Sequence, residues 1–193
     1  MMACDRPLSE RLAMKTSTIT RAALMAAVTA VAAQITVPLT PVPFTLQVLA
    51  VILSGLLLGA RIGALAQAVY VLVGAVGIPV FSSFTGGLGH VFGPTGGYLI
   101  SYPIAAAVAG LAAHTVARAS RQQALWAGFL WGCAGLAVIY VFGTTWLTVV
   151  SGLSPTEAVI TGILPFVIFD LIKVALAALV AVAAAPAIAL PHT

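Results

Sequence analysis

Residues 77–97 read GIPVFSSFTGGLGHVFGPTGG and separate two long apolar segments of the chain. Glycine and proline are so frequent in this stretch that it cannot form a regular membrane-spanning helix, because both residues destabilise helix interiors. The stretch therefore predicts an irregular loop between helices. Asp170 and Lys173 have the opposite character, since they are ionisable residues inside an otherwise apolar segment. We expect the loop and this pair to meet at the outer face of a helical membrane protein and to enclose a small solute there.

The overall composition excludes a soluble globular protein. Of the 193 residues, 62% are hydrophobic and only 6% are charged, whereas a soluble domain carries about 25% charged residues. So few charges cannot cover a surface that faces water. We therefore expect an all-α fold, a polytopic membrane protein in which six transmembrane helices form one bundle without a soluble domain.

Apolar segments between turn-forming stretches predict the six spans. They cover residues 20–37, 45–60, 63–76, 98–117, 124–150 and 165–185. A proline-rich link, residues 38–44, separates the first two spans. Ser154, Pro155 and Glu157 have the order of an N-cap residue, a first helical residue and a third one. This order predicts a short interfacial helix before the last span.

The first 19 residues read as a cytoplasmic tail, which leaves residues 20–190 as the transmembrane substrate-binding domain. A cleaved secretory signal is the competing interpretation, because basic residues precede an apolar run that contains an A-x-A motif. The run continues to Val37, however, and the rest of the chain is also apolar, which favours the tail. Translation could begin at Met1, Met2 or Met14.

Basic residues are distributed unevenly between the two sides of the predicted bundle. With the N-terminus in the cytoplasm, the inner segments contain seven of the eight lysines and arginines, namely Arg6, Arg11, Lys15, Arg21, Arg61, Arg118 and Arg121. The outer segments, residues 38–44, 77–97 and 151–164, contain none. This asymmetry follows the positive-inside rule, so we expect a multi-pass protein of the cell inner (plasma) membrane with both termini in the cytoplasm. Asp170 follows Pro165 by about 7.5 Å at the helical rise, which places it near the outer loops.

Asp170 and Lys173 stand three positions apart and therefore share one helix face. A charged side chain in mid-span costs about 2.5 to 3.5 kcal/mol on insertion scales, so its presence requires a reason. One interpretation is an ion pair that satisfies itself and orients the last span. The other interpretation is that both side chains hydrogen-bond a ligand, and we favour it because intramembrane ionisable residues are by default functional.

The glycine-rich loop offers a second set of candidate contacts. Its end, residues 93–97, leads into a span and is expected to leave backbone N–H groups free for an anion such as a carboxylate. His90 is either a solvated loop residue or a ligand contact. Aromatic residues of the region can wall an apolar pocket or pack on neighbouring helices, and these are Phe81, Phe84, Phe92 and Tyr98.

Motifs for catalysis, cofactors and metals are missing from the sequence. Lys15 and Lys173 do not complete a phosphate-binding loop, so any ATP hydrolysis requires another chain. The three histidines are dispersed, and a single intramembrane aspartate cannot form the carboxylate pair of an aspartic protease. The few basic residues are scattered and form no basic-aromatic patch. We therefore expect no enzyme, no cofactor, no bound metal and no nucleic-acid partner.

Small residues recur at every fourth position in three parts of the chain. They are Ala22, Ala26 and Ala30 in the first span, Gly55, Gly59 and Gly63 between the second and the third, and Gly128 and Gly132 in the fifth. This spacing lets helices approach one another closely. Internal packing is one interpretation of the alanine stripe, and a docking surface for a partner protein is the other.

Four segments resemble the BioY family, whose members are the biotin-specific substrate-capture (S) components of energy-coupling-factor (ECF) transporters. The segments are residues 43–47 (PFTLQ), 77–81 (GIPVF), 93–98 (GPTGGY) and 170–173 (DLIK), in the order of the family. The resemblance covers roughly residues 20–185. It implies a six-helix membrane protein that captures biotin from the outer face for ATP-driven uptake by partner subunits.

The resemblance also implies a set of ligand contacts. In such proteins the aspartate and the lysine of the last span bind biotin, and the first outer loop, here residues 38–44, serves as a lid. The implied contacts are Asp170, Lys173, Tyr98, Phe44, Phe84, His90, Thr95 and Gly96. The ureido ring of biotin suits a carboxylate beside an ammonium group, its sulfur ring suits an aromatic wall, and its carboxylate suits the glycine-rich helix start.

The implied partners are a transmembrane coupling (T) subunit and two ATPase subunits. The stripe of Ala22, Ala26 and Ala30 matches the surface on which S components dock the coupling subunit. Some BioY-type proteins are reported as working alone, so the partner set stays open, as does a homo-oligomer. Other open functions are an S component for another vitamin such as thiamin or riboflavin, a solitary proton-coupled carrier that uses Asp170, and an intramembrane enzyme, which the missing motifs disfavour.

Overall fold

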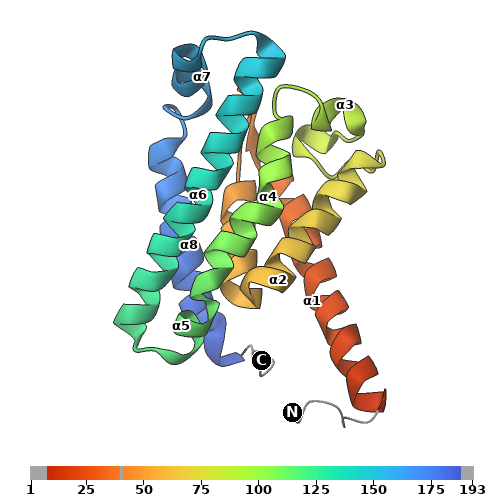
Figure 1. The fold of residues 1–193 in the computed structure, drawn as a ribbon, viewed down its shortest axis with the longest axis vertical. Helices are drawn as coiled ribbons and strands as arrows, with labels where there is room; N and C mark the ends of the chain where they lie inside the picture. Colours follow the sequence, from red (N-terminus) through yellow and green to blue (C-terminus); the bar gives the residue numbers. More distant parts are fainter. Residues whose placement is uncertain (1–7, 40, 188–193) are drawn as a thin grey trace, which may run out of the picture.

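The computed structural model describes residues 8–39 and 41–187, with side chains from residue 16 to residue 186. In this part of the chain five helices are long and apolar enough to cross a membrane. They are α1 (Leu8–Gln34), α2 (Gln47–Ala75), the continuous run of α4 (Gly96–Ala109), η2 (Gly110–Ala112) and α5 (Ala113–Arg118), α6 (Arg121–Ser151) and α8 (Val167–Ala184). Figure 1 shows them packed along one another, with the short helices and loops at one end.

Helix α2 is bent at Gly59 into two arms. Gly59 has φ 80° and ψ 169°, a conformation that glycine adopts easily because it has no Cβ. In Figure 1 the two arms form a V whose point lies at the end of the molecule near α5. The arms correspond to the predicted spans at residues 45–60 and 63–76. The five helices therefore supply six spanning segments, and the expected six-helix architecture is confirmed.

Glycines bring the arms of α2 close to each other and to α4. A Cβ atom built on Gly63 would lie 2.8 Å from the Cα atom of Gly55, and one built on Gly55 would lie 2.2 Å from the carbonyl oxygen of Ala106. Both positions therefore exclude any larger residue. The glycine spacing in the sequence reflects internal helix packing.

The other predicted spans agree with the observed helices, with shifted ends. Helix α1 begins at Leu8, well before residue 20, and part of the predicted tail is therefore helical. Residues 1–7 and 188–193 lie outside the described residues, and the division into a tail and a domain stays a prediction. Pro103 does not interrupt α4.

A short helix, α7 (Pro155–Gly162), follows α6 as expected. Ser154 accepts a hydrogen bond from the backbone N–H of Glu157, whose carboxylate accepts from the Ser154 N–H at 2.8 Å and from its hydroxyl at 2.7 Å. These bonds satisfy donors that a helix start leaves unpaired. Hydrogen bonds from the Ser154 backbone and side chain lower the pKa of Glu157.

The loops predicted to face outward, called the outer loops below, contain short regular elements that an all-α expectation does not include. Strands β1 (Thr36–Val37) and β2 (Phe44–Thr45) pair antiparallel on either side of the proline-rich link, with Thr36 opposite Thr45. Prolines cannot continue a helix interior, so the chain pairs its extended flanks instead. The glycine-rich stretch forms two single turns, η1 (Ser82–Phe84) and α3 (Leu88–Val91).

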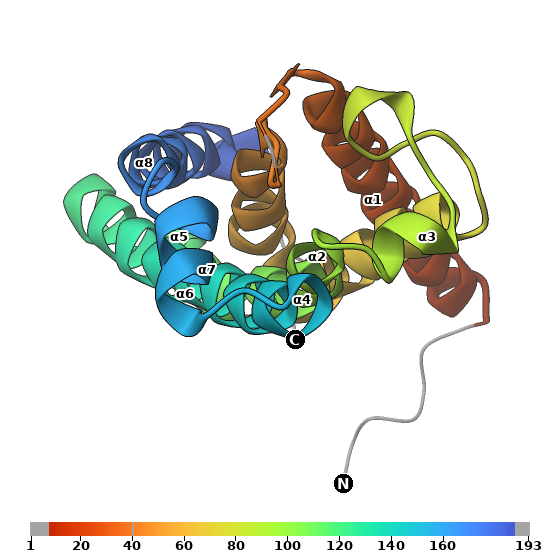
Figure 2. The ribbon, with the colours of Figure 1, turned by 90° about the horizontal axis from the view of Figure 1, so that it is seen from above.

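Helix α2 is the central element and contacts α1, α4 and α8. Viewed from above, α1 and α8 lie on opposite sides of α2 (Figure 2). The strands β1 and β2 connect α1 to α2 at the end that also carries α3 and α7. Residues far apart in the sequence are thereby brought together under the outer loops.

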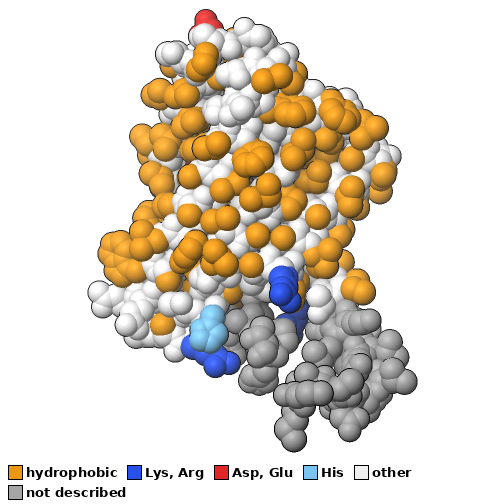
Figure 3. All heavy atoms as spheres, viewed as in Figure 1, with side chains coloured by type: hydrophobic (Ala, Val, Ile, Leu, Met, Phe, Trp, Pro, Cys, Tyr) orange, Lys and Arg blue, Asp and Glu red, His pale blue; other side chains and the backbone are white. Residues whose placement is uncertain are grey.

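Charged side chains lie at the two ends of the molecule, and the middle is apolar. Figure 3 shows lysine and arginine side chains near the end where α5 lies and an acidic side chain at the opposite end, near α7. Between them the visible surface is covered with hydrophobic side chains. Such a band suits a bilayer, so the chain is a multi-pass membrane protein.

Candidate ligand-binding site

Asp170 and Lys173 form an ion pair inside the bundle. The Lys173 Nζ atom lies 2.7 Å from Oδ1 of Asp170. Each residue is only 4% exposed, so neither side chain faces the surface that contacts lipid. The expected common face on α8 is confirmed, and it points toward α2 and α6, the helices against which α8 packs.

Both charged groups have further partners from other parts of the chain. The Tyr140 hydroxyl of α6 donates to Oδ2 of Asp170 at 2.7 Å. Lys173 donates to the backbone carbonyl of Thr45 at 2.6 Å and lies 3.7 Å from the centroid of the Phe44 ring. Charge-assisted hydrogen bonds and a cation–π contact offset part of the cost of burying the two charges.

A cavity of about 60 Å³ opens beside this pair. Its wall is assembled from the end of the first outer loop, the start of α2, the glycine-rich stretch, α3, α4, α6, the end of α7 and the start of α8. The expected meeting of outer loops and charged pair is therefore observed.

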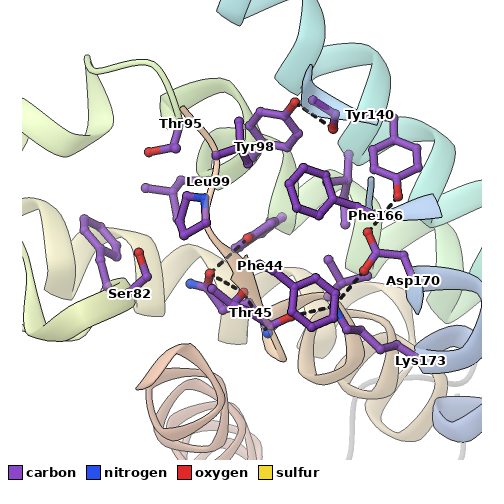
Figure 4. Close-up of a pocket in the computed structure, with 18 of the residues that line it drawn as sticks. Phe44, Thr45, Ser82, Thr95, Tyr98, Leu99, Tyr140, Phe166, Asp170 and Lys173 are labelled. Atoms are coloured by element: carbon purple, nitrogen blue, oxygen red, sulfur yellow. Dashed lines mark hydrogen bonds and ion pairs between the residues drawn. The ribbon is translucent and has the colours of Figure 1, made fainter. Parts of the chain in front are cut away.

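The cavity is polar at two places and aromatic between them. Asp170 and Lys173 lie on one side, and Ser82 and Thr95 lie on the opposite side (Figure 4). His90 also lines the cavity, and its ring lies 6.4 Å from that of Phe81, the neighbour of Ser82 in the chain. The charged side offers carboxylate acceptors next to an ammonium donor, which together match a neutral group that carries both N–H and C=O. The opposite side offers hydroxyl groups and an imidazole.

Aromatic rings line the space between the two polar sides. Phe44 stacks on Phe166 with ring centroids 6.2 Å apart and meets the edge of Phe169 at 5.5 Å. The hydroxyl of Tyr98 donates to the carbonyl of Gly162 at 3.1 Å, which fixes that ring against the end of α7. Such surfaces suit a flat or apolar part of a ligand.

A hydrogen-bond chain connects the first outer loop to the second behind the cavity. The Thr45 hydroxyl donates to Oε1 of Gln47 at 2.9 Å, and Nε2 of Gln47 donates to the Tyr70 hydroxyl. Tyr70 donates in turn to the carbonyl of Val80 at 3.2 Å. Gln47 lines the cavity, so this chain fixes its amide from behind.

The structure brings six of the eight expected contact residues to the cavity wall. They are Asp170, Lys173, Tyr98, Phe44, His90 and Thr95. Phe84 does not line the cavity, because the turn of η1 directs it outward and leaves it 72% exposed. Whether the six residues contact a ligand stays a prediction.

Gly96 is the second expected contact outside the cavity wall. Its N–H donates to the carbonyl of Gly93 at 3.0 Å and is therefore not free for an anion. A Cβ atom at this position would lie 1.8 Å from the carbonyl oxygen of Val91. Close packing therefore requires a glycine here, and whether Gly96 or the other N–H groups of this helix start contact a ligand stays a prediction.

The alanine stripe of α1 packs inside the bundle, and its role as a docking surface for a partner stays a prediction. Ala22 and Ala26 are buried, and Ala30 packs against the same hydrophobic core. The helix that α1 chiefly contacts is α2. Within this structure the small side chains serve internal packing, because they let α1 lie close to the bundle.

Sequence reasoning did not identify Tyr140, Phe166 or Gln47 as site residues. Tyr140 and Gln47 carry polar groups inside apolar segments, and a buried polar group needs a hydrogen-bond partner. All four tyrosines of the chain (Tyr70, Tyr98, Tyr102 and Tyr140) lie at the cavity wall or hydrogen-bond to a residue that does. Tyrosine within a span was therefore the signal that could have located the site. No comparable signal marks Phe166.

Comparison with known proteins assigns a family to this architecture. A family model described as the BioY family matches residues 7–190. A protein of Pyrococcus horikoshii named "Probable biotin transporter BioY" is 44% identical over 168 residues, which cover 87% of this chain and 96% of that protein. The "Biotin transporter BioY" of Thermotoga maritima is 44% identical over 161 residues, 83% of this chain and 91% of the relative.

A solved structure has the same fold. It is described as the S-component for biotin from an ECF-type ABC transporter, and it matches with a TM-score of 0.78 over 93% of this chain and 94% of the other. The two sequences are 23% identical in this alignment.

Proposed function

This chain belongs to the BioY family, and on that premise we propose that it binds biotin in the cavity beside Asp170 and Lys173 and takes part in its uptake across the membrane. The observation that carries the proposal is the buried pair of carboxylate and ammonium, 2.7 Å apart, at the wall of a cavity under the outer loops. The family is one of transport components and not of enzymes. The absence of catalysis in this chain stays a prediction.

The chemistry of biotin fits the two polar sides of the cavity. The ureido N–H groups donate to the carboxylate of Asp170, and the ureido carbonyl accepts from the ammonium of Lys173. The fused rings then lie against Phe44 and Tyr98. The carboxylate at the end of the aliphatic tail points to the side of Ser82 and Thr95, where hydroxyl donors are available.

Phe44 lies in the wall of the cavity and belongs to β2 at the end of the first outer loop. The centroid of its ring is 3.7 Å from the Lys173 ammonium group, so a ligand that hydrogen-bonds this ammonium has to share the space with the ring. We infer that the loop of residues 38–44, together with Phe44, opens and closes as a lid.

Uptake requires partner subunits in this proposal. A transmembrane coupling subunit and two ATPase subunits supply the energy, because the sequence contains no phosphate-binding loop of its own. The protein lies in the cell inner membrane with both termini in the cytoplasm, an orientation supported by the basic side chains at the end opposite the cavity. A coupling subunit has to use a surface other than the buried face of the alanine stripe, or α1 has to move.

Equilibrium binding to the purified protein tests the proposed ligand. Biotin should bind to the wild type and not to Lys173→Ala, and thiamin and riboflavin should not compete. The matched control is Arg121→Ala, which removes a cation at the opposite end of the bundle. If another vitamin binds and biotin does not, the protein is specific for that vitamin.

Co-purification in mild detergent tests the partner subunits. Uptake that uncouplers abolish at constant ATP would support the proton-coupled carrier instead.

A further inference from the structure

Gln34 is the last residue of α1, and its side chain binds the backbone of the second outer loop. Its Nε2 atom donates to the carbonyl oxygens of Phe81 at 3.1 Å and, at a longer 3.4 Å, of Val80. Its Oε1 atom accepts from the N–H of Phe84 at 2.9 Å. The same Nε2 atom donates to Ala30 of its own helix at 3.1 Å. Both the nitrogen and the oxygen of the Gln34 amide therefore form hydrogen bonds.

The loop that Gln34 binds has a conformation that needs support. Ser83 and Phe84 have φ values of 57° and 55°, in the left-handed region that costs a non-glycine residue of order 1 kcal/mol or more. The loop closes on itself through a bond from the Phe81 N–H to the Thr85 carbonyl at 2.9 Å. Gln34 adds a bond to the N–H of Phe84, one of the two left-handed residues.

This loop forms one wall of the cavity. Phe81 and Ser82 both line it, and Phe81 is buried against Tyr70 with ring centroids 5.7 Å apart. Ser82 belongs to the polar side opposite Asp170. A shift of the loop would therefore move both the ring and the hydroxyl away from the space that a ligand occupies.

Helix α1 offers a firm base for these contacts. The fully buried amide of Gln67 donates to the hydroxyl of Thr29 in α1 at 3.0 Å and to the hydroxyl of Ser54 at 3.1 Å. Ser54 and Gln67 come from different arms of α2. The polar cluster thus joins α1 to both arms, less than two turns before Gln34.

We propose that Gln34 is a positioning residue for the ligand site: it attaches the Phe81–Ser82 wall to α1 and so keeps the cavity in its binding shape. The ligand used below, biotin, rests on the proposed function. The positioning role itself can be measured without any ligand.

Gln34→Leu tests the role, because leucine fills a similar volume and cannot hydrogen-bond. The matched control is Gln122→Leu, which changes an exposed glutamine in the first turn of α6 at the other end of the molecule. Hydrogen exchange of the peptide that covers residues 80–86 should become about tenfold faster in Gln34→Leu and stay unchanged in the control. The dissociation constant for biotin should rise by about tenfold, with most of the change in the dissociation rate.

Gln34→Glu distinguishes the acceptor role of the Gln34 side chain from its donor role. It also provides a second variant if Gln34→Leu does not fold. The carboxylate keeps an acceptor for the Phe84 N–H but loses both donors, so exchange at Phe84 should stay slow while biotin binds more weakly.

Wild-type binding and exchange in Gln34→Leu would overturn the proposal. So would faster exchange confined to residues 31–34, which would make Gln34 a cap of α1 alone. If the wild type does not bind biotin but Gln34→Leu loses hydrogen-exchange protection at Phe84, biotin is not the ligand and the positioning role of Gln34 still holds.

Discussion

The hydroxyl of Tyr140 donates to Oδ2 of Asp170 over 2.7 Å and so links α6 to α8 across 30 residues of sequence. Lys173 occupies the other carboxylate oxygen, also at 2.7 Å. The carboxylate is therefore held from both sides in one orientation. A fixed acceptor is what a ligand with N–H donors requires, because its own binding energy need not be used to order the side chain.

Tyr140→Phe should weaken biotin binding about tenfold or more, since a hydrogen bond to a charged group contributes about 1.5 to 3 kcal/mol. Calorimetry on the purified variant measures the loss. Thr144→Val is the matched control, because its hydroxyl bonds only the carbonyl of Tyr140 within α6. Wild-type affinity in Tyr140→Phe would show that Lys173 alone orients the carboxylate.

Neutralising the charged pair should separate its two possible roles. Asp170→Asn and Lys173→Met each leave one buried charge without its partner, which costs about 3 to 5 kcal/mol of stability. The double variant should regain most of the thermal stability, because no unpaired charge remains. It should still not bind biotin. A double variant that binds biotin like the wild type would make the pair a structural element only.

Phe44→Ala should change the kinetics of binding as well as the affinity. The variant loses the cation–π contact to Lys173, about 0.5 to 2 kcal/mol, and the ring stack on Phe166. We expect biotin to associate and dissociate faster, with a net loss of affinity, in stopped-flow measurements. Leu39→Ala changes an exposed residue of the same loop and serves as the control. Unchanged rates would argue against Phe44 as part of a lid.

Gly74→Ala should disturb the cavity from behind. A Cβ atom at this position would lie 2.1 Å from the ring of Phe81, so the ring and its loop have to shift. Overpacking of this kind typically costs about 1 to 3 kcal/mol, and both thermal stability and biotin affinity should fall. Gly89→Ala, where the added atom meets nothing within 4 Å, should leave both close to wild type.

Much of the fold could be predicted because its signals are local. The boundary between the two spans that α2 supplies, the cap formed by Ser154 and Glu157, and the uneven basic residues each act through nearby chain geometry or through the membrane. The charged pair was equally visible, because ionisable residues stand out in an apolar segment. These features required no knowledge of which helices are neighbours.

The rest of the site depends on neighbours that the sequence does not reveal. Gln34 and Tyr140 acquire their roles from a loop and a carboxylate that are distant in the chain. Gly96 resembled an anion-binding residue, and only the nearby carbonyl of Val91 explains why it must be glycine. Ala22 and Ala26 fit either a surface that binds a partner or a contact between helices of the same chain, and their four-residue spacing alone cannot distinguish these alternatives.

One contact of Lys173 has a consequence for genetic variation. Its acceptor at position 45 is a peptide carbonyl, and not the threonine side chain. Every amino acid at that position carries the same oxygen, so a point mutation there cannot delete the acceptor. The lysine loses this anchor only when the paired strands slip in register or separate. A screen for inactive alleles should therefore recover substitutions that distort the paired strands β1 and β2 around Thr36 and Phe44 more often than substitutions of Thr45 itself.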